Sequence, residues 1–185
     1  MDKKQLDRFF NSPKPQTKNF VHGEYHPLFG QEYPLLVDRL PYINRCRLKF
    51  IDNTFRAVVP ESHSPTRQKK ELTDLMLKLY LEHGKKIINE KVFHYSKVLS
   101  VSYNRITLKK VSSIWGSCSR QNNLNFNRKL VMAPHPVVDY VVIHEVCHLV
   151  HRHHRKDFWS LVRSLCPDYK DHVRWLKSNH HLLTI

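Results

Sequence analysis

The sequence has few glycines and few acidic residues, and it contains no long hydrophobic run. Only four of its 185 residues are glycine, and we find no repeat of fixed period, which excludes collagen-like and repeat architectures. No segment approaches the roughly 18 consecutive apolar residues that a membrane helix needs, and the first residues lack the apolar core of a secretory signal. We therefore expect a cytoplasmic protein with no membrane partner. The four cysteines form no CxxC pair, which argues against a zinc knuckle.

Positive charge dominates the chain. It has 31 Lys+Arg against 16 Asp+Glu, a formal net charge of +15, and a pI near 9.8. Such an excess is typical of proteins that meet nucleic acid, nucleotides or acidic protein surfaces, although a basic surface with no such partner explains it equally well. The hydrophobic fraction of 41% is ordinary for a globular domain.

The chain divides into a short tail and one domain. Residues 1–20 are polar and contain two prolines, which predicts a flexible N-terminal tail. We expect residues 21–185 to form a single domain. Short β-branched and aromatic segments predict strands within residues 21–60, with a hairpin turn at Asp52-Asn53.

Helical and extended patterns alternate in the rest of the chain. A helical period covers about residues 67–97, with Gly84 as a point where this helix can bend. The segments RITLKKV and NLNFN then predict strands. Three helices follow, one after Pro136 and the others at about residues 157–165 and 168–178. The sum is an α+β fold.

The strongest chemical signal is the HExxH motif His144-Glu145-Val146-Cys147-His148, in a predicted helix that is otherwise almost entirely apolar. Residues four apart lie about one turn apart on the same helix face, so both imidazoles can bind one zinc ion. Glu145 can reach water on that ion and take its proton as attack begins. A buried glutamate without such compensation costs several kcal/mol. The motif therefore predicts a catalytic metal centre.

A catalytic zinc site needs a third protein ligand. His151 would lie about 10 Å along the axis from the first motif histidine, too far for a comfortable shared site. His154 requires the chain to leave the helix and turn back. The spacing leaves the choice open among His151, His153, His154 and Asp157.

A second histidine pair, His22 and His26, also has the i, i+4 spacing. Its glutamate is in the wrong position, and Pro27 follows the second histidine. This setting is typical of a strand or turn, so we expect no metal site there.

Further motifs surround HExxH. They are Trp115-Gly116-Ser117-Cys118-Ser119, Asn123-Leu124-Asn125-Phe126-Asn127, His154, Phe158-Trp159 and Pro167-Asp168-Tyr169-Lys170. In this combination the sequence resembles the YgjP-like metallopeptidase domain, a minimal zincin related to the SprT-like proteins. The resemblance is dense from about residue 75 to 183 and sparser from about residue 21.

The resemblance implies a Zn²⁺ site formed by His144, His148 and His154, with Glu145 as the general base. It also implies a zincin-like layout, in which a small, mostly antiparallel sheet packs on a long helix and on the HExxH helix. The LNFN strand would then border the cleft, and its free edge could pair with an extended peptide.

Two positions depart from the family pattern. Ile114 stands where the family usually has a basic residue, and Asn122 replaces a common glycine, although asparagine also tolerates a left-handed turn. The remaining motif residues have structural interpretations: we expect core packing for Trp115, Phe158 and Trp159, a buried inert thiol for Cys118, and a helix-start role for Asp139.

These observations favour a zinc-dependent peptidase that cleaves polypeptides. The residue that stabilises the oxyanion stays open among Tyr169, His151, His153 and Arg128. One alternative is a metal-dependent nucleoside triphosphate pyrophosphatase on the same site, which suits the positive charge but lacks a Walker-type loop. A second alternative is a nucleic-acid-associated binding protein that uses the basic surface, which leaves Glu145 without a role.

Overall fold

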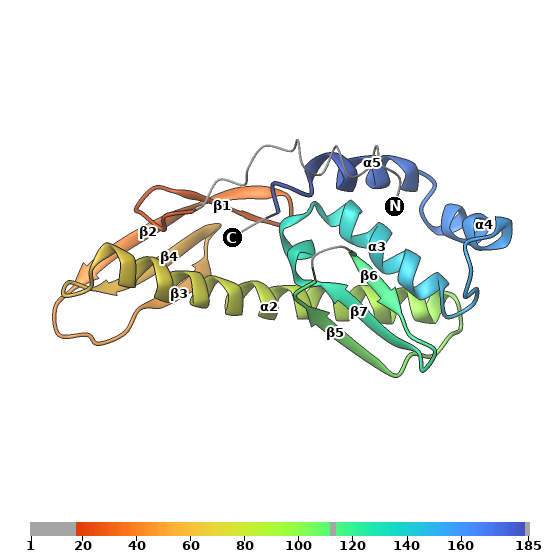
Figure 1. Cartoon of the computed structure of the whole chain (residues 1–185), viewed down its shortest axis with the longest axis horizontal. Coiled ribbons are helices and arrows are strands. Elements are labelled where there is room, and N and C mark those ends of the chain that lie inside the picture. The colour runs from red at the N-terminus through yellow and green to blue at the C-terminus, as the bar shows by residue number, and fades with distance from the viewer. Residues whose placement is uncertain (1–17, 112–113, 184–185) are drawn as a thin grey trace.

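One long helix, α2 (Pro65–Val98), runs through most of the length of the molecule and carries both of its sheets (Figure 1). The computed structural model describes residues 18–111 and 114–183. Ser64 caps the helix by accepting a hydrogen bond from the backbone N–H of Arg67 (3.3 Å). The helix is continuous through Gly84, where an added Cβ would lie 2.9 Å from the Leu108 side chain. The glycine therefore allows close packing and does not introduce a break.

The N-terminal sheet packs on the first half of α2 and has the strand order β1-β2-β4-β3. Its strands are β1 (Tyr25–Leu28), β2 (Gln31–Leu40), β3 (Arg47–Ile51) and β4 (Thr54–Pro60). β2 and β4 run parallel, whereas the other two pairs are antiparallel. Asp52 and Asn53 connect β3 to β4 with φ values of 50° and 55°, which confirms the predicted hairpin turn.

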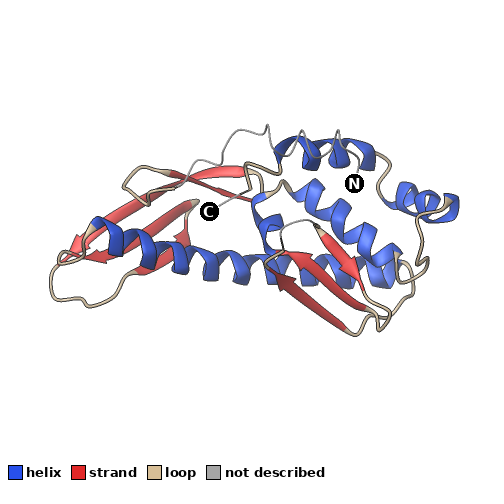
Figure 2. Ribbon diagram, in the orientation of Figure 1, coloured by secondary structure: helices blue, strands red, loops and turns tan. Residues whose placement is uncertain are grey.

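A second sheet lies beside the other half of α2, with the order β5-β7-β6 (Figure 2). Its strands are β5 (Arg105–Lys109), β6 (Gly116–Cys118) and β7 (Asn123–Asn127). The α+β class is confirmed, but the described residues form two small sheets where the sequence suggested one. The expectation of a free edge on the LNFN strand is wrong: β7 is central because β5 pairs with it in parallel and β6 in antiparallel fashion. The edge strands are β5 and β6, and β6 is the one that contacts α3.

The remaining elements surround the motif helix. They are η1 (Arg128–Met132), α3 (His135–Cys147), α4 (Lys156–Leu165) and α5 (Tyr169–Asn179). α3 contacts α2, α4, α5 and β6, which explains why it is apolar on all sides. Within residues 18–111 and 114–183, no helix is both long and apolar enough to span a bilayer.

The N-terminal boundary of the fold differs slightly from the expectation. Residues 1–17 of the predicted tail lie outside the described residues. Phe20 is 1% exposed and belongs to the core, and its backbone N–H donates to the Glu24 carboxylate (2.5 Å). The folded part therefore starts before residue 21.

Candidate metal centre

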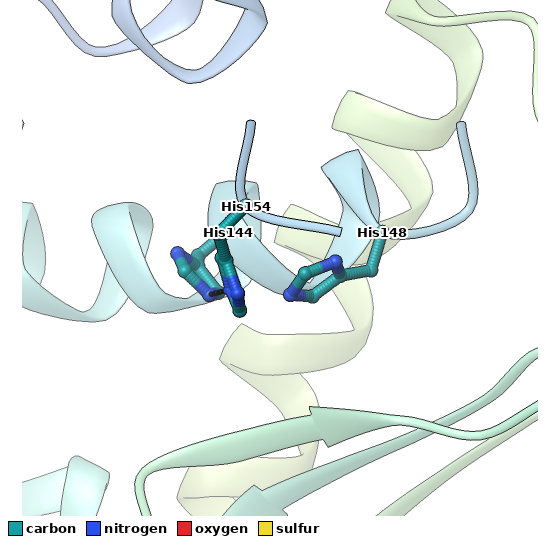
Figure 3. A group of neighbouring side chains, drawn as sticks. All are labelled: His144, His148 and His154. Carbon is teal, nitrogen blue, oxygen red and sulfur yellow. Dashed lines mark hydrogen bonds between the residues drawn. The ribbon is translucent and has the colours of Figure 1, made fainter. Parts of the chain in front are cut away.

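Three histidines from two segments meet at the end of α3 (Figure 3). His144 lies in the last turn of the helix, and His148 is its C-cap. The chain leaves the helix after the motif and returns, so that Nε2 of His154 lies 3.1 Å from Nε2 of His144. One ring nitrogen from each of the three residues lies within 4.8 Å of the other two. The turn that the sequence required for His154 is therefore present.

The neighbours of the three rings position them, and for His148 they determine which ring nitrogen can bind a ligand. Nδ1 of His148 lies 3.0 Å from the carbonyl oxygen of His151, which leaves Nε2 as the nitrogen that can bind a ligand. Phe158 is fully buried and stacks on the His148 ring at 4.5 Å between centroids. It also makes edge contacts with the rings of His144 and His154, at centroid distances of 5.0 and 4.8 Å. All three histidines therefore pack on the same buried aromatic ring.

Two of the three imidazoles are held in the uncharged form. Burial lowers the pKa of His144 to about 3, and the neighbouring His148 and His154 add to this effect. Burial also lowers the pKa of His148. Neutral imidazoles are the form that binds a metal ion. Nδ1 of His144 is buried without a hydrogen-bond partner among the described residues.

Glu145 is one of the few buried charged side chains of the described residues, with 4% exposure. Burial raises the pKa of its carboxyl group to about 8. Its Oε2 has no hydrogen-bond partner in the described part of the chain. Its other side packs against β6, where a Cβ on Gly116 would lie 2.6 Å from Oε1. The carboxyl group therefore lies between the motif helix and the edge strand.

The hydrogen bonds between β6 and β7 determine which backbone groups of β6 point away from the sheet. The backbone N–H of Asn127 donates to Trp115 O (2.8 Å), and that of Ser119 donates to Asn123 O (2.9 Å). In an antiparallel pair these bonds alternate along the strand. The backbone groups of Gly116 and Cys118 therefore face away from β7. The edge beside Glu145 exposes a short row of backbone donors and acceptors.

Other candidates for the third ligand form a group of their own. Nδ1 of His151 lies 3.3 Å from Asp157 Oδ2, and Nδ1 of His153 lies 3.7 Å from Asp157 Oδ1. Tyr169, a candidate oxyanion helper, is buried and stacks on Trp159 at 5.2 Å, and Trp159 stacks in turn on His154 at 5.8 Å. Arg128, another candidate oxyanion helper, is the first residue of η1 and belongs to a different segment of the chain from Tyr169 and Trp159.

Sequence reasoning did not identify two residues that hold this region together. Arg152 donates from Nη1 to Ser119 O (2.7 Å) and to Cys118 Sγ (3.0 Å), and from Nη2 to Asn122 Oδ1. Asn127 donates from Nδ2 to Val111 O and Ile114 O, both at 3.0 Å. Both roles depend on contacts distant in sequence, and no local pattern marks them.

The residues of the surrounding motifs differ in their burial. Phe158 is core, as predicted, whereas Trp115 and Trp159 are only partly buried. Cys118, expected to be a buried inert thiol, is half-buried and accepts a hydrogen bond from Arg152. Asp139 lies beyond the first turn of α3 and pairs with Lys91 of α2 (2.7 Å).

The two histidines of the other i, i+4 pair lie in different environments. His26 is 1% exposed and packs between Phe20 and Phe55, at ring distances of 4.8 and 6.0 Å. His22 is exposed, and its Nδ1 lies 3.2 Å from the backbone nitrogen of Val37. The absence of a metal site at this pair stays a prediction.

A family model described as "YgjP-like, metallopeptidase domain" matches residues 3–179. The chain belongs to this family. It is accordingly a metal-dependent hydrolase, and the three converging imidazoles, together with the nitrogen and carboxylate atoms that have no partner among the described residues, fit a metal ion. A search of curated proteins found no significant match.

Two solved structures resemble part of the chain. The metallopeptidase zymogen abylysin of Pyrococcus abyssi is 17% identical, with a TM-score of 0.44, over 48% of this chain and 91% of the other. The metallopeptidase zymogen jannalysin of Methanocaldococcus jannaschii is 22% identical, with a TM-score of 0.36, over 49% of this chain and 92% of the other.

Proposed function

We propose that this YgjP-like protein is a zinc-dependent peptidase, with His144, His148 and His154 as the zinc ligands. Three imidazole nitrogens are a common set of protein ligands for catalytic zinc, whose fourth coordination position stays open for water or substrate. When bound, the ion supplies a Lewis acid that acidifies water and polarises a carbonyl group. The observation that carries the proposal is the convergence of these nitrogens, within 4.8 Å of one another, next to a buried glutamate.

Glu145 is the proposed general base. Its Oε2 has no partner among the described residues, so it is available to accept a proton from the attacking water and to carry it to the leaving amine. Burial raises the pKa of this carboxyl group to about 8, and a bound cation beside it would favour the carboxylate form. A proton carrier with a pKa near the working pH serves both steps.

The edge strand favours a polypeptide substrate. An extended peptide can pair with the outward backbone groups of Gly116 and Cys118, and β6 lies directly against Glu145. This pairing places a peptide bond, rather than a side chain, next to the proposed base. A nucleoside triphosphate has no backbone that could use the same row of donors and acceptors.

Two alternatives remain predictions. The net charge of +15 suits a nucleoside triphosphate or a nucleic acid. Neither uses the strand edge beside the metal centre, so the peptidase is preferred. A nucleic-acid surface would also be compatible with peptidase activity on protein bound to nucleic acid.

The test compares wild type with Glu145→Gln on an unfolded protein and on nucleoside triphosphates, after metal quantification. The variant should retain one zinc ion at the three histidines and lose turnover by about 10²–10⁴-fold, the range expected for a general base. Glu82→Gln makes the same chemical change at an exposed position of α2 and should remain active. Full activity of Glu145→Gln would refute the base, and turnover of triphosphates alone would replace the peptidase.

A further inference from the structure

We propose that His151, His153 and Asp157 bind a second divalent transition-metal ion, in the loop that carries His154. This auxiliary site has its own ligands and does not depend on the proposed peptidase activity. Two imidazoles and one carboxylate form a donor set that Zn²⁺ accepts.

The geometry of the three side chains supports the auxiliary site. Nδ1 of His151 faces Asp157 Oδ2 at 3.3 Å, and Nδ1 of His153 faces Asp157 Oδ1 at 3.7 Å. One donor atom from each residue lies within 4.8 Å of the other two. The two imidazole rings are inclined by 30° to each other, with centroids 5.9 Å apart. Each ring therefore presents a nitrogen to a different oxygen of one carboxylate.

One of these nitrogens is unsatisfied. Nδ1 of His153 is buried and has no hydrogen-bond partner among residues 18–111 and 114–183, because 3.7 Å to Asp157 is too long for a hydrogen bond. A buried polar atom without a partner destabilises the folded state. The side chain as a whole is 42% exposed, so an ion from solvent can reach the group. A cation between the three donors would satisfy the orphaned nitrogen.

Asp157 provides the negative charge that such an ion requires. Its Oδ1 accepts a hydrogen bond from the backbone N–H of Phe158 (2.9 Å), in the first turn of α4. This bond, with the two histidines, keeps the pKa of the carboxyl group below its usual range. Oδ2 faces Nδ1 of His151 at 3.3 Å, so the carboxylate presents an oxygen to each of the two imidazoles.

Two other groups of potential ligands are already satisfied by their neighbours. In the group around Cys46, the Glu71 carboxylate accepts from Arg67 Nε (3.0 Å) and from the Cys46 backbone N–H (3.2 Å), and burial raises the pKa of the thiol to about 11. In the group around Cys166, the thiol donates to Asp168 (3.5 Å). Neither contains an orphaned buried nitrogen of the kind found at His153.

The auxiliary site would stabilise the catalytic one. His151 and Asp157 flank His154, and the carbonyl oxygen of His151 lies 3.0 Å from Nδ1 of His148. An ion that joins the two ends of this loop fixes the conformation in which His154 reaches His144. Loss of such a supporting contact typically weakens metal binding about 10–100-fold.

The experiment counts zinc ions bound to the metal-stripped full chain, by calorimetric titration and elemental analysis. Wild type should bind two ions, of which the weaker is lost in Asp157→Asn and in His153→Gln. His154→Ala should lose the tighter ion and keep the auxiliary one, so failure of the catalytic site is distinguishable from failure of this proposal. Asp74→Asn, at an exposed position of α2, should still bind two ions.

The expected coupling is a reduction of about tenfold in affinity at the remaining site of Asp157→Asn. Asparagine retains an oxygen that can accept the Phe158 bond, so the start of α4 is preserved. One bound ion in wild type would overturn the proposal. Two bound ions in both Asp157→Asn and His153→Gln would also overturn it, because these residues would then not be ligands. Loss of both ions in both variants would overturn it too, because the three residues would then form no separate site.

Discussion

Gly116 of the edge strand lies directly against Glu145 of the motif helix. A Cβ at residue 116 would stand 2.6 Å from both Cγ and Oε1 of the glutamate, a separation that non-bonded atoms do not adopt. Only glycine allows β6 to approach the proposed base this closely. The glycine in the WGSCS motif therefore has a steric explanation in the site itself.

Gly116→Ala should inactivate the protein while leaving it folded. The methyl group displaces the Glu145 side chain, β6 or both, and a misplacement of about 1 Å can reduce turnover about 10²-fold. Zinc content should not change, because the three histidines are not touched. Circular dichroism, elemental analysis and peptide hydrolysis together test this expectation. Wild-type turnover by the alanine variant would show that the contact has no catalytic consequence.

Arg152→Ala should weaken metal binding. Its guanidinium joins the loop that carries His154 to the turn between β6 and β7 through Ser119 and Asn122. Without this link the loop gains freedom, and zinc affinity should fall about tenfold. Competition with a chromogenic chelator measures the change. Arg155→Ala removes the same charge from an exposed position of the same loop and should retain wild-type affinity; equal losses in both variants would point to charge alone.

Asn127→Ala should destabilise the second sheet. The side chain is 3% exposed and donates two hydrogen bonds of 3.0 Å, to Val111 O and Ile114 O, in the segment that leads into β6. Removing both donors leaves carbonyl oxygens without partners, at an expected cost of about 2–3 kcal/mol. Urea unfolding measures this difference. Asn125→Ala, in the same strand, removes one bond of 3.3 Å to Ser117 and should have a smaller effect than Asn127→Ala.

The parts of the fold with strong local patterns could be predicted from the sequence. The helical period over residues 67–97 corresponds to α2, and Asp52-Asn53 forms the predicted turn. β6 was not predicted, because its three residues show no alternation of polarity. Its existence depends on pairing with β7, a long-range contact. The same contact explains why the free edge was assigned to the wrong strand.

In the candidate site, too, local patterns could be predicted from the sequence and long-range contacts could not. The helix period alone placed His144 and His148 on one face, and both lie there. The choice of His154 came from the family resemblance, because spacing cannot describe a loop that turns back. The structure brings its Nε2 to 3.1 Å from that of His144. The contacts made by Arg152 and Gly116 connect elements that are separate in sequence, so no local signal could reveal them.

The buried His26 should make the fold sensitive to acid. Burial is the main reason that its pKa is lowered to about 4 from 6.5, although Glu24 opposes the shift. The folded state therefore binds this proton less readily than the unfolded state does. Stability is unaffected above pH 6.5 and falls as the pH drops from about 6.5 to about 4, by at most about 3 kcal/mol.

His26→Phe removes the titrating group and keeps an aromatic ring against Phe20 and Phe55. Urea unfolding of both proteins without metal, at pH 7 and pH 4.5, isolates its contribution, because all other titrating groups are shared. The phenylalanine variant should lose less stability than wild type over this range. Equal losses would show that the folded core accommodates the proton on His26. The neighbour responsible would then be Glu24, because its Oε2 lies 3.6 Å from Nε2 of His26.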